Sequence, residues 1–190
     1  MLTNEQIKTF FNLLDCYLVG DINTFLREDI MSQRCGGCCF PAIQTIASGM
    51  ELLGLLMFGG NYLEIKKDTD RNFRVFKDFW NNYMVKKSPD YKIITPQLFR
   101  DSVRNPIAHF SFVRRKVFIM KEGEKRIWVE EGFLKINLPK LASDFLSCYF
   151  DIRNVLLDEK NIKTISIFSI GYKILEGESS KTDSEIAKLI

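Results

Sequence analysis

Residues 41–58 read PAIQTIASGMELLGLLMF, an apolar stretch with few polar side chains, among them Gln44, Ser48 and Glu51. A helix that is apolar on nearly all sides belongs in the interior of a protein. Its length would also suit a membrane span, but a carboxylate near the centre of a bilayer is costly. We therefore expect a buried central helix around which the rest of the chain packs, and no membrane segment.

The composition is that of one globular domain. The 190 residues are 46% apolar and 27% charged, and sixteen phenylalanines against two tryptophans predict a core rich in aromatic rings. The net charge of +3 permits a polyanionic partner without requiring one. No secretory signal is recognisable, and five cysteines, an odd number, do not suggest a disulfide framework. We expect a cytoplasmic protein.

Further helices are predicted where apolar residues recur at helical spacing. Thr3 and Gln6 form a capping box before the first helix, and Thr95-Pro96 supplies an N-cap followed by proline. The central helix ends at Gly59-Gly60. The other predicted helices are Glu5–Ile30, Arg71–Val85, Pro96–Val103 and Asn137–Asp158. A short, weakly defined element follows the last of these helices, at 162–175.

One region has the composition of strands. Residues 112–120 and 126–136 are rich in β-branched and aromatic side chains and flank a glycine-containing loop at 121–125. We expect a β-hairpin over about residues 112–136. Residues 176–190 are polar and are predicted to form a mobile C-terminal tail. The fold class is therefore mainly α, with a single domain over residues 1–175.

The string RNPIAH at residues 104–109 contains the only histidine of the chain. Histidine titrates near neutral pH and transfers protons, and arginine clamps phosphate through a planar fork of donors. On a straight helix Arg104 and His109 would lie about 140° apart. Pro106 disfavours helical geometry at Asn105, so a kink there would turn both side chains into one cleft. The alternative is a structural histidine and a surface or ion-paired arginine.

This string resembles the signature of the HEPN superfamily, in which four to six residues separate an arginine from a histidine and a polar residue often follows the arginine. Arg104, Asn105 and His109 match these three positions, within a helical region of about 5–158. The resemblance implies a HEPN-like antiparallel helical bundle, with the β-hairpin inserted after the motif.

The resemblance also implies an activity. It implies a metal-independent endoribonuclease without a cofactor, which cleaves RNA through attack of the 2′-hydroxyl, with Arg104 on the phosphate and His109 moving the proton. Two motifs would face each other across a homodimer cleft. A toxin or antiviral defence role, with an inhibitor or antitoxin protein as partner, is implied as well. The alternative is a catalytically inactive HEPN-like module that binds RNA or another protein.

Glu51 and the cysteines each have two interpretations. The Glu51 carboxylate could orient Arg104 or His109, or it could pair with another base or face water at the edge of its helix. Cys35, Cys38 and Cys39 form a CxxCC cluster that lacks the fourth ligand of a structural zinc site. Cysteines without such completion are usually small buried side chains, and we expect no metal.

Arg114, Arg115 and Lys116 open the predicted hairpin close to the motif. Basic side chains beside a cleft would suit the phosphates of an RNA backbone. A solvated charged hairpin explains them equally well, because Glu122 and Glu124 dilute the positive charge.

Overall fold

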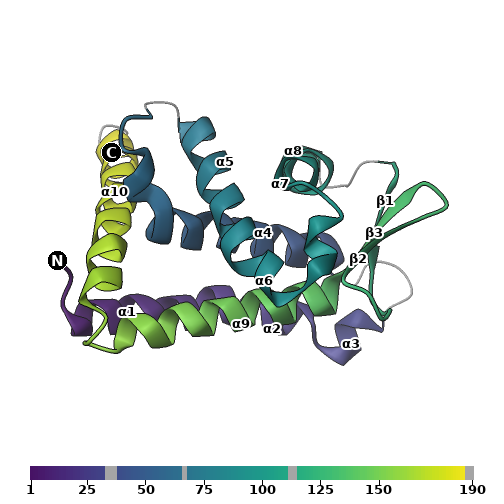
Figure 1. The fold of residues 1–190 in the computed structure, drawn as a ribbon, viewed down its shortest axis with the longest axis horizontal. Helices are drawn as coiled ribbons and strands as arrows, with labels where there is room; N and C mark the ends of the chain where they lie inside the picture. The colour runs from purple at the N-terminus through teal and green to yellow at the C-terminus, as the bar shows by residue number, and fades with distance from the viewer. Residues whose placement is uncertain (33–37, 66–67, 111–114, 187–190) are drawn as a thin grey trace.

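The computed structural model describes residues 1–32, 38–65, 68–110 and 115–186, with the backbone alone at 68, 108–110 and 178–186 (Figure 1). The described chain is mainly helical, and a small sheet lies at one end of the helices (Figure 1). The longer helices are α1 (Asn4–Leu14), α4 (Cys39–Phe58), α5 (Asp68–Phe79), α9 (Leu138–Leu157) and α10 (Ile162–Ile186). The shorter helices are α2 (Gly20–Phe25), α3 (Glu28–Met31), α6 (Val85–Lys87), α7 (Pro96–Phe99) and α8 (Asn105–Phe110).

The central helix is α4, as predicted from its apolar sequence. It contacts α2, α5, α9 and α10, and its side chains Ile46, Met50 and Leu53 are fully buried. Among the described residues, Cys39–Tyr62 is the one segment long and apolar enough to cross a membrane. Because 61% of its most apolar 18-residue window is buried inside the protein, it resembles the core helix of a soluble protein.

Two glycines allow other helices to approach α4 closely. A Cβ atom added to Gly54 would lie 2.4 Å from the carbonyl oxygen of Val75 in α5. A Cβ atom added to Gly171 in α10 would lie 2.5 Å from the carbonyl oxygen of Leu56. Both contacts are with backbone atoms, which cannot move aside as a flexible side chain can. The two crossings therefore require glycine.

The first predicted helix is confirmed over most of its length but ends early. The capping box of Thr3 and Gln6 is present, and the chain stays helical from α1 through a π-helical turn at Asp15–Val19 to the end of α2. Arg27 then has extended geometry, with ψ at 141°, and separates α2 from α3. The third predicted helix is continuous through α5, a π-helical turn at Trp80–Met84 and α6.

The predicted kink at Asn105 is wrong, because Asn105 is helical with φ −67° and ψ −45°. The chain remains helical from Pro96 to Phe110, beyond the predicted end at Val103. A π-helical turn at Arg100–Arg104 explains this continuity. The Asn105 N–H donates to the carbonyl of Arg100, five residues earlier, so the hydrogen-bond ladder has already shifted before Pro106, which has no N–H to donate.

The predicted two-stranded hairpin is replaced by a three-stranded sheet of β1 (Val117–Met120), β2 (Ile127–Glu130) and β3 (Phe133–Asn137). Its order is β1-β3-β2, with β1 parallel and β2 antiparallel to β3. The second predicted strand is split by Glu131-Gly132, whose φ values of 52° and 76° suit a two-residue hairpin turn. As a result β3, and not β2, lies beside β1. Residues 112–114 of the first predicted strand lie outside the described residues.

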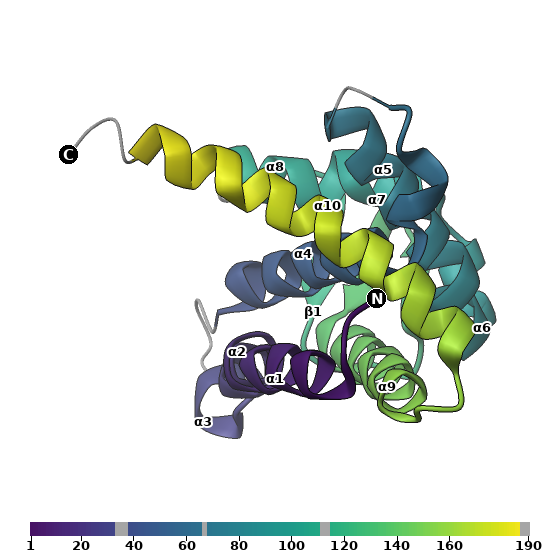
Figure 2. The same cartoon turned by 90° about the vertical axis from the view of Figure 1, so that its left-hand side faces the viewer.

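The final helix is longer than predicted. Residues 176–186, predicted as part of a polar mobile tail, continue α10 as a helix to Ile186. Figure 2 shows α10 crossing over α4 toward the outer edge of the molecule. Extending a helix that packing has already started adds one hydrogen bond for each ordered residue, and no proline follows Pro139 to stop it.

Gly171 and Gly177 lie in the same helix and provide a matched test of the α4–α10 crossing. We expect Gly171→Ala to lower the free energy of unfolding by about 1–3 kcal/mol, because the added methyl group meets the backbone of α4. Gly177 has no atom within 4 Å of an added Cβ. Gly177→Ala should raise the stability by about 0.5–1 kcal/mol through helix propensity. Urea unfolding of both variants measures the difference, and equal effects would contradict the crossing.

Candidate functional site

The predicted site residues Arg104 and Glu51 form an ion pair. The Nη2 atom of Arg104 donates to Oε2 of Glu51 over 2.7 Å. Arg104 ends the π-helical turn before α8, and Glu51 lies in the middle of α4. The structure thus joins the segment that carries the motif to the central helix through the one carboxylate of the apolar stretch.

Asn105 is a second neighbour of this arginine. The Nη1 atom of Arg104 lies 3.4 Å from Oδ1 of Asn105, a long hydrogen bond. The side chain of Arg104 is 23% exposed and that of Glu51 is 13% exposed. The Arg104 side chain is therefore held at the edge of the core, with part of it exposed.

Two atoms of the ion pair have no hydrogen-bond partner within the described part of the chain. They are Nε of Arg104 and Oε1 of Glu51, and both are buried. Buried polar atoms are nearly always paired in proteins, so each orphan atom calls for a partner such as water or a bound group. The buried Nε–H of Arg104 is thus without a partner among the described residues.

His109 lies in α8, five residues after Arg104. Its side chain is outside the described part of the structure, so its direction stays a prediction. The backbone of α8 is regular, and the π-helical turn precedes Asn105 rather than separating the two motif residues. The expected break therefore does not bring positions 104 and 109 to the same face of their helix.

The predicted basic residues are only partly described. Arg114 lies outside the described residues, whereas Arg115 and Lys116 are exposed in the turn before β1. The carbonyl of Lys116 accepts a hydrogen bond of 2.8 Å from the N–H of Leu134 in β3. Both side chains thus stand where the segment from α8 enters the sheet.

The cysteine cluster is likewise incomplete, because Cys35 lies outside the described residues. Cys38 and Cys39 are half-buried, and burial raises the pKa of Cys39. Cys38 has left-handed geometry, with φ at 51°, and begins α4 as its N-cap. Over the described ranges, no group of three His, Cys, Asp or Glu residues could hold a metal ion.

A buried polar cluster around Asp144 was not predicted. Tyr91 donates to Oδ2 of Asp144 over 2.9 Å, and Arg126 beside β2 forms an ion pair with the same carboxylate. Burial, and then Asp144, raise the pKa of the Tyr91 phenol. The sequence signal was an aspartate three residues after Leu141 on the apolar face of α9. Arg126 stands beside β2 and Asp144 lies in α9, so this cluster attaches the sheet to the helices.

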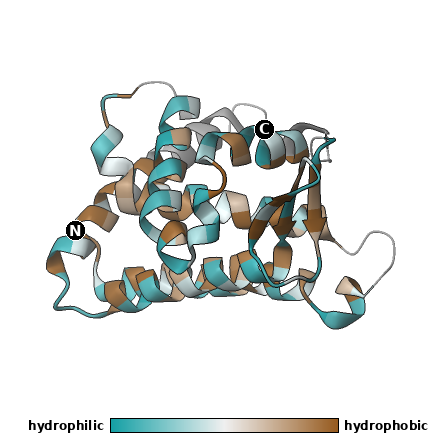
Figure 3. Ribbon diagram, turned by 45° about the vertical axis from the view of Figure 1, so that its right-hand side comes forward, coloured by the Kyte–Doolittle hydropathy of each residue, from teal (hydrophilic) through white to brown (hydrophobic). Residues whose placement is uncertain are grey.

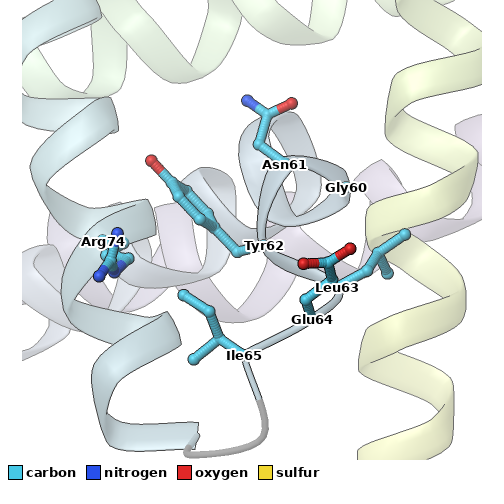
Figure 4. Close-up of a pocket in the computed structure, with 7 residues that line it drawn as sticks. All are labelled: Gly60, Asn61, Tyr62, Leu63, Glu64, Ile65 and Arg74. Atoms are coloured by element: carbon cyan, nitrogen blue, oxygen red, sulfur yellow. The ribbon is translucent and has the colours of Figure 1, made fainter.

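A surface pocket of about 460 Å³ lies after the end of α4 (Figure 4). The guanidinium of Arg74 lies 5.8 Å from the centre of the Tyr62 ring, and Tyr62 donates to Asp78 over 2.7 Å. The pocket shares no residue with the Arg104–Glu51 pair. Its lining residues are Gly60, Asn61, Tyr62, Leu63, Glu64, Ile65 and Arg74.

Comparisons of the chain with protein-family models, curated proteins and solved structures found no match. Any function has therefore to be argued from these residues and their geometry.

A double-mutant cycle tests the Arg104–Glu51 pair. Glu51→Ala and Arg104→Ala should each destabilise the protein, because each leaves a partly buried charge without its partner. We expect a coupling energy of about 1 kcal/mol from urea unfolding. Lys87 and Asp151 form a more exposed pair, with the Asp151 side chain 62% exposed, and serve as the control. Their coupling should be below about 0.5 kcal/mol. Additive effects at Glu51 and Arg104 would contradict the pair.

Alkylation of the native protein tests the burial of the thiols. Cys148 is buried, which raises its pKa to about 12, whereas Cys16 is exposed. The thiolate is the reactive form, so we expect iodoacetamide at pH 8 to modify Cys16 and to spare Cys148 until the chain is unfolded. Mass spectrometry of the digested protein measures both sites. Equal modification of Cys16 and Cys148 in the native state would show that α9 is packed differently.

Proposed function

We propose that this protein is a metal-independent endoribonuclease of the HEPN type, acting as a homodimer. The observation that supports the proposal best is the ion pair of Arg104 with Glu51, because it anchors the motif arginine to the core while leaving 23% of its side chain exposed. An arginine anchored in this way is prepared to bind a phosphate with little loss of side-chain entropy.

The proposed reaction is the attack of an RNA 2′-hydroxyl on the adjacent phosphate. One imidazole of His109 removes the hydroxyl proton as the new P–O bond forms. The bond to the 5′-oxygen breaks, and that oxygen takes a proton from a second, protonated imidazole. Arg104 neutralises the charge that develops on the phosphate, and Glu51 acts as a positioning residue for Arg104. The products are a cyclic phosphate and a free hydroxyl.

Two features favour a two-fold arrangement of protomers. One histidine cannot conveniently serve as base and acid in the same step, whereas a dimer provides two. In addition, the chain is helical from Arg104 to His109, which puts these positions about 140° apart, so a partner copy is needed to bring an arginine and a histidine to one phosphate. His109 is the only histidine of the chain, so no second histidine of the same protomer can act as the acid.

The proposed biological role follows from the activity. A ribonuclease that needs no metal ion is active wherever RNA is present, so a cell must restrain it. We accordingly propose a cytoplasmic toxin or antiviral effector with an inhibitor or antitoxin protein as partner.

The second candidate is an RNA-binding or interaction module without turnover. It is favoured by the neutralisation of Arg104 in the free chain, where Glu51 already supplies the opposite charge at 2.7 Å. Such a module would use Arg104 for structure and bind RNA without cutting it.

Cleavage of a 5′-labelled single-stranded RNA by the full chain in EDTA tests the proposal. We expect Arg104→Ala and His109→Ala each to lower the cleavage rate by at least about 100-fold, since each removes a group that acts in the transition state. Glu51→Gln should lower it by about tenfold, because the arginine loses its anchor. Far-UV circular dichroism should show that the variants are folded.

Arg100→Ala is the matched control for the motif arginine. Arg100 lies one turn earlier on the same helix, with its guanidinium 5.2 Å from the Phe73 ring centre and a hydrogen bond to the Thr69 carbonyl. Its removal should leave the rate within about threefold of the wild type. Cleavage that persists in both Arg104→Ala and His109→Ala would reject the site. RNA binding without any product would favour the second candidate.

A further inference from the structure

One face of the three-stranded sheet carries partly exposed aromatic side chains. The strand register places Phe118, Lys135 and Trp128 in one row across β1, β3 and β2. The next row, of Ile119, Ile136 and Ile127, points to the opposite face, where Ile136 and Ile127 are fully buried. The sheet stands at one end of the molecule (Figure 3). We call the exposed side, with Phe118, Trp128, Phe133 and Lys135, the outer sheet face.

The aromatic rings of the outer sheet face are held in place by their neighbours. Phe118 is 46% exposed, and its ring centre lies 5.1 Å from that of Phe133. One edge of the Trp128 ring lies against Gly123, where an added Cβ would come within 3.2 Å of the ring. Gly123 also has φ at 131°, so both its backbone geometry and the nearby Trp128 ring disfavour any residue with a side chain there. Each of these rings therefore packs against a neighbouring group while part of it remains exposed.

The positively charged side chain of Lys135 lies in the middle of the aromatic row, between Phe118 and Trp128. Lys135 forms an ion pair with Glu130, and Nε1 of Trp128 lies 3.5 Å from the same carboxylate. The hydrogen bonds from Lys135 and then Trp128 lower the pKa of Glu130, which is therefore ionised at neutral pH. Arg115 and Lys116 are exposed just before β1 and add positive charge at its start.

The alternation of rings and a cation favours one class of occupant. Nucleobases stack on aromatic rings in any sequence, while the phosphates between them require cations. The core of a protein–protein interface is depleted of charged residues, lysine in particular, so a lysine at the centre of the row disfavours a second copy of this chain as occupant. A sheet that presents aromatic rings to successive bases is a recurrent mode of binding single-stranded RNA.

We propose that the outer sheet face binds the bases of single-stranded RNA and holds the strand that the motif cleaves. Binding of RNA by this face does not depend on the proposed function, whereas delivery of the strand to the motif for cleavage rests on it. From Phe110 at the end of α8 to Val117 at the start of β1 there are seven residue steps, which span at most about 25 Å. A strand stacked on the outer sheet face can therefore extend to the segment that carries Arg104.

Binding of a fluorescein-labelled 2′-O-methyl oligouridine to the full chain tests the inference. This probe lacks the attacking hydroxyl, so binding is measured separately from cleavage. Fluorescence anisotropy provides the affinity, and quenching of tryptophan emission reports stacking on Trp128 because the other tryptophan, Trp80, is fully buried. We expect Phe118→Ala and Trp128→Ala each to weaken binding by about tenfold or more.

Conservative variants separate stacking from folding. Trp128→Phe and Phe118→Tyr keep a ring and should retain binding within about threefold. Lys135→Gln should reduce the dependence of affinity on salt by about 0.7 in the log–log slope, the value for one phosphate contact on a single strand. Glu130→Gln should strengthen binding, because it releases Lys135 from its ion pair. The affinity for an apolar protein partner should not increase in the Glu130→Gln variant.

Ile162→Ala is the matched control for loss of an exposed apolar side chain. Ile162 is 62% exposed at the start of α10, at the other end of the molecule (Figure 1). It should leave binding unchanged. Binding by Phe118→Ala and Trp128→Ala equal to wild type, or no binding by wild type, overturns the inference. A change of molecular mass in those variants with unaltered RNA binding overturns it in favour of a second copy.

The proposed function fails separately from this inference. If the wild type binds the probe through the outer sheet face but does not cut unmodified RNA, the binding surface stands and the nuclease is rejected. If it cuts RNA and the aromatic variants cut equally well, the nuclease stands and the binding surface is rejected.

Discussion

The need to cover α4 on every side governs the rest of the structure. An apolar helix of 20 residues is stable in water only when other segments remove its surface from solvent, and here α2, α5, α9 and α10 do so. The coverage is close enough that α5 and α10 meet it at glycine, where even a methyl group would collide with backbone. The position of the motif helix depends on this packing, because α8 and the π-helical turn before it contact α4.

Glu51 is the one charged residue of α4, and its position links the core to the candidate site. A carboxylate there has to be paired, and Arg104 supplies the charge from the segment that continues into α8. The requirement of the core and the requirement of the proposed chemistry are thus met by the same contact. A helix broken at Pro106 would place this segment differently, but the π-helical turn keeps it continuous.

Prediction succeeded where the deciding signal is local. The capping box at Thr3 and the N-cap at Thr95 depend on side chains within three residues of the groups they bind, and both are present. It failed where partners are distant in sequence. The strand order β1-β3-β2 joins residues 117–120 to 134–137, and composition cannot reveal such a pairing. The turn at Glu131-Gly132 was missed because a glutamate with positive φ is uncommon.

The burial of α4, the start of most helices and the residue types that could carry chemistry were predictable without coordinates, because they depend on side-chain polarity and short-range hydrogen bonds. Three contacts are visible only in the folded chain: Glu51 with Arg104 across 53 positions, Asp144 with the sheet, and the partly exposed row of Phe118, Lys135 and Trp128. The first depends on packing around α4, and the other two depend on strand pairing and on contact between the sheet and α9, none of which a local pattern specifies.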